Sequence, residues 1–357
     1  MTINLLLFGH DTIECAYYLR KAYGSALNFE QLAIDKETLR QVKHSDPKVI
    51  NLGGIEFLLQ PYGSSSGFPF VISNQDFTIS FGEFNNPSFF VKFRSFALWR
   101  EGAMAMHRQF MQWAEVLGLV PIKPEGLSRV DFSFDYHLPV IDFDEDNFVS
   151  LSTKDTQYRK DGKIQTFKLG ESDVVLRIYD KIAEIEEQSG KSWFFELWGI
   201  AENVWRIEWQ VRKDILRRFS IRTFTDLQDA QGDVLRYLAT EHSSLRNKTD
   251  DSNRSRWPLH PLWIDLQEQI RKLEYQGVYR EIDQQAILNE RLMRMTISMY
   301  GYLKRIAAVH CIQTGESMIT DAEAMQRLEN LIARVHEPMT WRTDVTKRID
   351  SIRLGQW

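Results

Sequence analysis

Cysteine is scarce in this chain of 357 residues, which holds only Cys15 and Cys311, far apart in the sequence. Two cysteines so widely separated exclude a disulfide framework and a cysteine-based zinc site. Long apolar runs are also missing: the stretch Ile3–Phe8 near the start is far shorter than the roughly 20 residues that span a bilayer. No basic segment precedes it, so we expect no export signal, no membrane association and a reducing, cytoplasmic location.

An excess of positive charge is absent as well. The chain carries 44 Lys and Arg against 49 Asp and Glu, a net charge of −5, which gives no overall signature of a nucleic-acid-binding protein. The exception is local, because residues 206–222 hold six basic side chains against the two acids Glu208 and Asp214. We predict a DNA-binding patch there, made of Arg206, Arg212, Lys213, Arg217, Arg218 and Arg222.

Two kinds of motif are missing. No H-x-H pair occurs, so any metal is expected to be held by oxygen rather than by paired histidines. The segments Gly53-Gly54 and Gly63–Gly67 lack the lysine and the helix context of a P-loop, so no ATP site is expected. What remains is an ordinary globular composition, 43% hydrophobic and 26% charged, which excludes a disordered, collagenous or coiled-coil chain.

The pattern of apolar residues predicts an α+β fold. Alternating segments separated by Gly, Pro, Asn and Ser predict strands at Ile55–Gln60, Phe68–Ser73, Phe77–Phe84 and Ser88–Phe96. Helices are predicted at Ile13–Tyr23, Phe29–Val42 and Arg100–Leu117, and over most of the chain after Lys213. The polar residues 247–256 resemble a linker. We therefore predict a domain of residues 1–246, with a largely antiparallel sheet and flanking helices, and a helical C-terminal domain of residues 257–357.

Three further strands each have one apolar face and one polar face. Residues 129–135 alternate Val130, Phe132 and Phe134 with Arg129, Asp131, Ser133 and Asp135. In residues 174–181 the polar side holds Arg177, Tyr179 and Lys181, and in residues 205–212 it holds Arg206, Glu208, Gln210 and Arg212. If these strands adjoin, their polar faces form one surface of the sheet.

Such a surface would hold the parts of an enzyme that breaks and rejoins phosphodiester bonds. Tyr179 is a candidate covalent nucleophile, and Arg177 and Lys181 on either side of it could neutralise a phosphate and favour the phenolate form. The carboxylates offer oxygen ligands for Mg²⁺ or Mn²⁺, which can polarise a phosphoryl oxygen. The same alternation is also typical of the solvated outer face of an antiparallel sheet.

Strand geometry limits the metal site. Asp131 and Asp135 are four residues apart, which is roughly 13 Å in a straight strand at about 3.3 Å per residue. One ion cannot bind both, so we expect it to take one of them together with Glu208 from a neighbouring strand. Asp131 is the first choice, and His137 or water would fill other positions.

The succession of these strands resembles the Rep_trans family of rolling-circle replication initiators of small plasmids, which includes phage replication proteins and some conjugative relaxases. The resemblance covers about ninety residues, 128–219. It is carried by the segments SRVDFSFD at 128–135, LG at 169–170, LRIYDK at 176–181 followed by Glu184, WRIE at 205–208 and RKD at 212–214.

The resemblance implies a function for these residues. Tyr179 would be the nucleophile that nicks one strand at the replication origin, keeps the 5′ phosphate and releases a 3′-OH for the polymerase. Asp131, Asp135 and Glu208 would be the acidic positions of the metal site. Many relatives carry a tyrosine just before the hairpin glycine, where this chain has Leu169, so Tyr179 is the strong candidate and Tyr158 lies nearby in sequence.

The expected partners follow from that reaction. They are single-stranded or cruciform origin DNA, a host helicase and a host polymerase. One chain offers one strong tyrosine, whereas a replication cycle needs a cut to start and another transfer to finish, so we expect a homodimer. The helices at Leu262–Tyr275 and Glu281–Gln313 are candidate dimer surfaces. Two alternatives stay open: a conjugative relaxase with the same chemistry, and a DNA-binding regulator that keeps the fold without the activity.

Overall fold

The computed structural model describes residues 3–41, 47–160, 163–273 and 284–353. The chain divides into two compact units, Met1–Arg280 and Glu281–Trp357. Each is described by itself.

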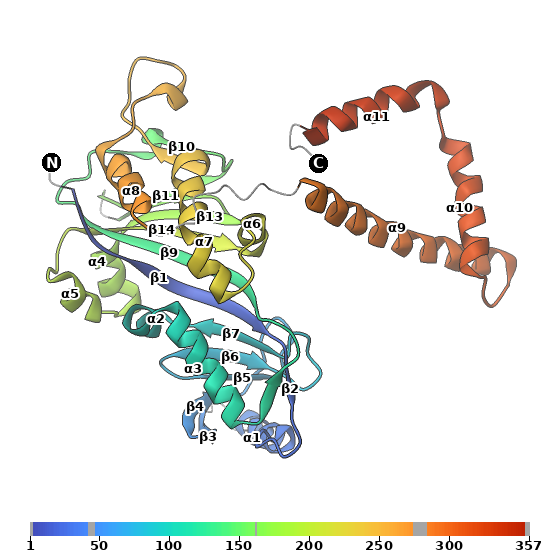
Figure 1. The fold of residues 1–357 in the computed structure, drawn as a ribbon, viewed down its shortest axis with the longest axis horizontal. Coiled ribbons are helices and arrows are strands. Elements are labelled where there is room, and N and C mark those ends of the chain that lie inside the picture. Colours follow the sequence, from blue (N-terminus) through green and yellow to red (C-terminus); the bar gives the residue numbers. More distant parts are fainter. Residues whose placement is uncertain (1–2, 42–46, 161–162, 274–283, 354–357) are drawn as a thin grey trace. The chain divides into compact units, whose positions relative to one another are not determined.

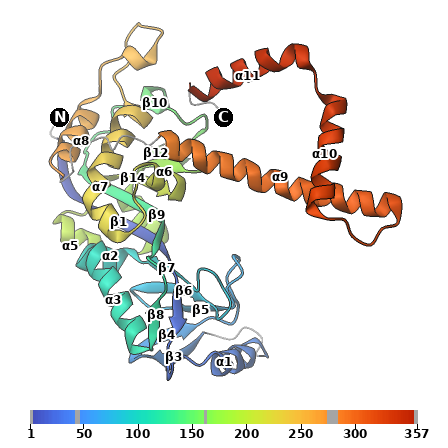
Figure 2. The same cartoon turned by 45° about the vertical axis from the view of Figure 1, so that its right-hand side comes forward.

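The first unit is built on one long antiparallel sheet (Figures 1 and 2). The strand order is β11-β12-β13-β14-β9-β1-β7-β6-β5-β4-β3. The strands are β1 (Asn4–Tyr17), β3 (Lys48–Leu52), β4 (Ile55–Leu59), β5 (Phe70–Ser73), β6 (Phe77–Phe81), β7 (Phe89–Phe93), β9 (Gly126–His137), β11 (Asp155–Lys160), β12 (Lys163–Leu169), β13 (Val174–Asp180) and β14 (Val204–Arg212). Two short ribbons pair β2 (Leu19–Lys21) with β8 (Leu119–Pro121) and β10 (Phe148–Ser150) with β15 (Ser243–Leu245).

Helices cover parts of both faces of this sheet. They are α1 (Phe29–Gln41), α2 (Ser95–Glu101), α3 (Ala103–Val116), α4 (Lys181–Glu184), α5 (Trp193–Trp198), α6 (Lys213–Arg218), α7 (Phe224–Tyr237) and α8 (Pro261–Arg271). Figure 1 shows α7 and α8 on one side of β9 and β14, and α4 and α5 on the other. The predicted α+β class, with a largely antiparallel sheet, is confirmed.

The first strand, β1, overturns a prediction. The helix expected at Ile13–Tyr23 is wrong, because this part of the chain is extended and pairs with β9 along its length and with β7 in its second half. Ile13, Cys15 and Tyr17 alternate along it and are buried, as a strand with one face in the core requires. The first strand in sequence therefore joins the two halves of the sheet.

The apolar face of the central strands holds the core. Phe132, Phe134, Ile207 and Trp209 are buried there, and the Trp209 ring meets Trp263 of α8 edge-on at 5.7 Å between centroids. Each buried aromatic side chain removes on the order of 150–250 Å² from water. This packing anchors the strands that carry the polar residues of the opposite face.

The packing of helix α8 shows that it belongs to the first unit. Trp263, Leu266 and Ile270 belong to the same buried cluster as the sheet, and Trp263 Nε1 donates to the carbonyl of Ala239 at 2.8 Å. Residues 257–273 are thus part of the first unit. The boundary between the units at 280/281 differs from the predicted linker at 247–256, because the polar composition there reflects a surface loop rather than a domain border.

The second unit is helical. It consists of α9 (Gln284–Thr314), α10 (Asp321–Val335) and α11 (Pro338–Arg353). Thr320 and Glu323 form a reciprocal capping box at the start of α10. Among its described large apolar side chains, Leu303 is buried and most of the others are exposed. No described helix is both long enough and apolar enough to cross a membrane.

Candidate functional site

The polar faces of the three predicted strands do lie side by side. Arg177 of β13 stands opposite Glu208 of β14, and Tyr179 stands opposite Arg206. On the other side of β14, Gln210 stands opposite Asp131 of β9. Directly opposed residues of an antiparallel pair share one face. The sheet therefore gathers the tyrosine, the carboxylates and the arginines on one surface, away from the Trp209 core.

Tyr179 is held by a carboxylate. Its hydroxyl donates to Glu208 Oε2 at 3.0 Å, and Arg177 Nη1 donates to Glu208 Oε1 at 3.1 Å. Burial, followed by the charge of Glu208, raises the pKa of Tyr179 well above its ordinary value. The side chain is therefore a neutral phenol. The expected stabilisation of a phenolate by Arg177 and Lys181 is not what the structure shows.

Lys181 lies over the ring of Tyr179, with Nζ 5.5 Å from the ring centroid, and pairs with Glu184. The strand ends at Asp180, whose carboxylate accepts hydrogen bonds from the first backbone N–H groups of α4. Lys181 then starts α4 and is only 1% exposed, with Nζ 2.5 Å from Glu184 Oε2 and over the Phe194 ring. Burial, together with nearby Arg206, lowers the pKa of Lys181. The charge of Lys181 is therefore paired with Glu184.

Asp131 and Glu208 are the two carboxylates that the sequence predicts to hold one metal ion together. Both are buried, and Asp131 receives Arg129 Nε at 2.8 Å and Nη2 at 2.5 Å. Burial raises the pKa of Asp131 to about 7, Arg129 opposes the rise, and the charge of Glu208 adds to it. The negative charges of the two carboxylates therefore repel each other, and a cation placed between them would reduce that repulsion.

Asp135 has a different partner. It accepts Arg206 Nε at 2.6 Å, Arg206 Nη2 at 2.8 Å and Trp198 Nε1 at 2.9 Å, and both Asp135 and Arg206 are 0% exposed. Arg206 Nη1 also reaches Asp11 of β1 at 2.6 Å. Helices α2 and α5 cover this end of the polar face. The structure therefore places Asp135 in an ion pair rather than a metal site, and places Arg206 in the interior rather than in a DNA-binding patch.

Asp11 is a site residue that the sequence did not reveal. The register of β1 against β9 shifts between His10 and Thr12, so Asp11 is the extra residue of a β-bulge. Its carboxylate receives Arg206, Ser95 Oγ at 2.8 Å and Lys191 Nζ at 3.2 Å, and Arg206 and Lys191 hold its pKa far below the ordinary value against the effect of burial. The sequence shows Asp11 beside other polar residues of β1, which does not predict a partner 195 residues away.

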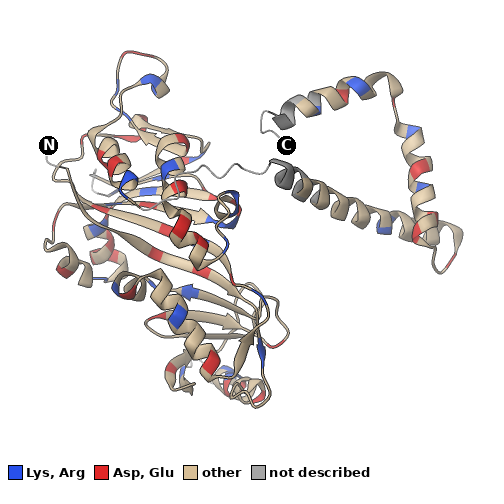
Figure 3. Ribbon diagram, in the orientation of Figure 1, with Lys and Arg blue, Asp and Glu red and all other residues tan. Residues whose placement is uncertain are grey.

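The remaining predicted DNA-binding residues do form an exposed basic patch on and around α6 (Figure 3). Its members are Arg212, Lys213, Arg217, Arg218 and Arg222. Within the described residues, none of the five has an ion-pair partner. Arg212 stands opposite Arg129, and Glu14 and Lys92 continue the same row across β1 and β7. Arg129 is paired with Asp131 and Glu14, so Arg212 and Lys92 are the exposed cations of this row without an ion-pair partner among the described residues.

The donors suit a metal only in part. No group of three or more His, Cys, Asp or Glu that could hold an ion occurs among the described residues. Asp131 and Glu208 nevertheless supply two carboxylates, although Arg129 donates to both oxygens of Asp131 and burial raises the pKa of Asp131. Mg²⁺ is commonly bound through one or two carboxylates, with waters and phosphate oxygens completing the shell. The residues present fit that kind of site, without Asp135.

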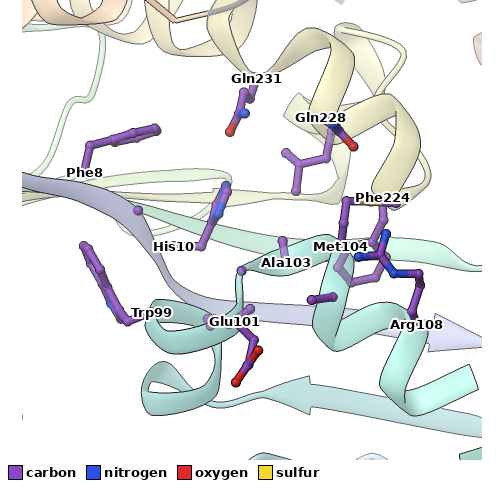
Figure 4. Close-up of a pocket in the computed structure, with 15 residues that line it drawn as sticks. Phe8, His10, Trp99, Glu101, Ala103, Met104, Arg108, Phe224, Gln228 and Gln231 are labelled. Atoms are coloured by element: carbon purple, nitrogen blue, oxygen red, sulfur yellow. The ribbon is translucent and has the colours of Figure 1, made fainter. Parts of the chain in front are cut away.

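A separate cavity of about 450 Å³ lies between β1, the α2–α3 turn and α7 (Figure 4). Phe8, Trp99 and Phe224 form apolar walls, and His10 and Gln231 point into the space between them. Burial lowers the pKa of His10 to about 4, so the ring is neutral at pH 7. Tyr179 and Glu208 do not line this cavity, but Trp99 does, and its Nε1 donates to Asp11 at 3.4 Å.

Comparison with known proteins gives one structural neighbour to describe. No family model matches the chain, and no curated protein matches it. The chain is similar to a solved rolling-circle replication initiator protein from Geobacillus stearothermophilus, at 16% sequence identity and a TM-score of 0.43. The matched region covers 76% of this chain and 98% of that one.

Proposed function

We propose that this chain nicks and rejoins one strand of DNA through Tyr179. The observation that carries the proposal is the hydrogen bond from the Tyr179 hydroxyl to Glu208, on a sheet face that continues into an exposed basic patch. A hydroxyl nucleophile is commonly activated by an adjacent base that is oriented by a third group. Glu208 is such a base, and Arg177 orients it.

The chemistry follows from these contacts. Tyr179 Oη attacks the phosphorus of the scissile phosphodiester while its proton passes to Glu208. The bond from phosphorus to the 3′ oxygen breaks, the leaving 3′ oxygen takes up a proton, and the 5′ phosphate remains on the tyrosine. In the reverse direction a 3′-hydroxyl attacks the phosphotyrosine and the phenol is restored. Because burial and Glu208 raise the pKa of Tyr179, proton removal has to accompany attack rather than precede it.

Asp131 and Glu208 would hold a divalent ion, Mg²⁺ or Mn²⁺, which when bound would polarise a phosphoryl oxygen. A carboxylate offers about four lone-pair sites, so the contacts of Glu208 to Tyr179 and Arg177 leave acceptor capacity. The exposed Arg212 and Lys92 and the patch on α6 would bind the phosphates on either side of the nick. Such contacts position the strand and do not read its sequence.

The biological setting we propose is initiation of rolling-circle replication at an origin, with host helicase and polymerase as later partners. It is supported by the motifs of 128–219 that resemble the Rep_trans family. A relaxase of a conjugative element would use the same site. A homodimer is also part of the proposal, supported by α9, where exposed apolar residues recur at spacings of three and four: Leu292, Met295, Met299, Tyr302 and Val309, with Ile306 half-buried.

The test is covalent capture. Purified protein is incubated with a supercoiled plasmid that carries the gene of this chain and its flanking DNA, and nicks are mapped by sequencing. We expect a site-specific nick with protein attached to the 5′ end, and a peptide map that places the adduct on Tyr179. Tyr179→Phe should keep DNA affinity and lose the nick. A wild-type protein that binds this DNA without cutting it would favour the regulator, and an adduct elsewhere would refute the assignment.

A further inference from the structure

A second tyrosine shares the face and the register of Tyr179. Tyr158 of the edge strand β11 stands opposite Thr166 of β12, and Thr166 stands opposite Tyr179 of β13. Directly opposed residues of antiparallel strands point to the same side. Two strand spacings of about 4.8 Å put the backbones of the two tyrosines about 10 Å apart. This proximity could not be read from the sequence, where a hairpin separates them.

The burial of the residues next to Thr166 and Tyr179 shows on which face of the sheet the two tyrosines lie. Phe167 and Ile178, which flank Thr166 and Tyr179 along their strands, are buried in the core. Thr166 and Tyr179 are only partly buried, and Tyr158 is 54% exposed. Tyr158 therefore projects from the polar side of the sheet, the side that carries Glu208 and Arg177, and a strand bound at Tyr179 has access to it.

Cations lie along the adjacent row. Lys168 of β12 stands directly opposite Arg177 of β13, two residues along the strands from the line that joins the two tyrosines and on the same face. Lys168 is partly exposed and has no ion-pair partner in the described part of the chain. A phosphate between Tyr158 and Tyr179 would therefore meet positive charge from both strands. The edge position of β11 leaves the approach to Tyr158 open on one side.

We infer that Tyr158 is a second nucleophile of the same chain, acting while Tyr179 is occupied by DNA; the inference rests on the proposed nicking function. Tyr158 Oη attacks the phosphorus of a second scissile bond, and the 3′ oxygen leaves with a proton. That 3′-hydroxyl then attacks the phosphotyrosine at Tyr179, its proton passes to the departing phenol, and the first strand is rejoined. The adduct has moved from Tyr179 to Tyr158, and the bonds broken equal the bonds formed.

The consequence concerns the dimer. The expectation of a homodimer rested on the need for a nucleophile from a second protomer, because one strong candidate was visible in the sequence. With Tyr158 in the same row, one chain holds both nucleophiles. A dimer formed through α9 is compatible with this arrangement, but it would not have to supply the second tyrosine.

The experiment separates the two steps. Full-length protein is first loaded with an oligonucleotide that spans the mapped nick, and a second labelled copy of that oligonucleotide is then added. We expect wild-type protein to release a joined product and to carry the second label on Tyr158 in a peptide map. In Tyr158→Phe, formation of the first adduct should stay within about twofold of wild type, while the second transfer falls by about 100-fold or more. Tyr62→Phe, at another exposed tyrosine, is the matched control and should behave as wild type.

Mixing tests whether the second nucleophile comes from the same chain. Tyr158→Phe combined with Tyr179→Phe should not restore the second transfer if one chain must hold both tyrosines. Restoration would place the second nucleophile on a partner protomer and overturn the inference, as would a Tyr158→Phe enzyme that completes both steps at the wild-type rate. Failure of wild-type protein to form any adduct would instead refute the nicking function itself.

Discussion

The buried ion pair between Asp135 and Arg206 permits a test that distinguishes a structural carboxylate from a metal ligand. Asp135 accepts three hydrogen bonds, two from Arg206 and one from Trp198, and neither member of the pair is exposed to solvent. Asp135→Ala leaves the Arg206 guanidinium in the interior with Asp11 as its remaining carboxylate. We expect the loss to appear first in stability.

Breaking a buried ion pair by removing one partner typically costs about 3–5 kcal/mol. Because Asp11 still contacts Arg206 at 2.6 Å, the lower end of that range applies, about 3 kcal/mol. At roughly 2–4 °C per kcal/mol for a large domain, the melting temperature should fall by roughly 6–12 °C. The assay is thermal unfolding followed by tryptophan fluorescence or near-ultraviolet circular dichroism, with and without Mg²⁺.

Asp131→Asn is the matched control, since Asp131 lies four residues earlier on the same strand. Its pKa of about 7 is above the ordinary value, so the folded state disfavours the ionised form, and the neutral amide should cost little stability at pH 8. The reasoning is refuted if Asp135→Ala melts within about 2 °C of wild type, a change worth less than about 1 kcal/mol, while losing metal-dependent cleavage. That result would return Asp135 to the metal site.

Four other outcomes are expected. The nicking rate should fall by about tenfold or more on chelation, in Asp131→Ala and in Glu208→Ala, while DNA affinity changes by less than about threefold. Full cleavage in the presence of chelator would contradict the metal role. Reversing Arg217 and Arg218 to Glu should reduce the slope of log affinity against log salt by about 2, as measured by fluorescence anisotropy, and an unchanged slope would move the DNA contact elsewhere. Burial lowers the pKa of His10 and of His242 to about 4, below the unfolded value of about 6.5, so the folded protein should lose stability as the pH drops from 6.5 to 4. In His242→Gln the urea midpoint should fall less over that pH range than in wild type. Parallel curves for the two proteins would exclude His242 as a cause. Sedimentation should give a dimer mass that Met299→Lys converts to a monomer, whereas a wild-type monomer at all concentrations would exclude assembly through α9.

The sequence predicted the polar faces better than it predicted the contacts within them. Alternation of apolar and polar residues located β9, β13 and β14 and their buried faces, because a strand with one side in the core has a period of two. It could not pair Arg206 with Asp135 or Asp11, since ion pairing depends on which strands adjoin and where the register falls. Arg206 was therefore predicted to be exposed in the DNA-binding patch, whereas helix α5 covers this part of the polar face and Arg206 is buried.

Two other features escaped for related reasons. The helix predicted at Ile13–Tyr23 overlooked that Ile13, Cys15 and Tyr17, at every second position, are the buried residues of a strand. Tyr158 was known only as a residue nearby in sequence, and its place beside Tyr179 depends on the pairing of β12 with both neighbours. The basic residues on and around α6 are exposed, and their grouping could be predicted because neighbours on a short helix need no long-range information; that they bind DNA stays a prediction.

The central position of β1 has a consequence for how the protein folds. Strand β1 has to wait for β9, which is made more than a hundred residues later, before it gains its longest partner. Contacts between residues so far apart in sequence stabilise the chain only after the entropy of closing a long loop has been lost, which slows folding. The hairpins of β3 to β7 can close early by themselves, whereas β9, β13 and β14 and the tyrosine site complete only when β14 has been made. The polar face that carries Tyr179 and Glu208 therefore forms late, and a chain cut short before residue 204 would hold Tyr179 on β13 without the strand that carries Glu208.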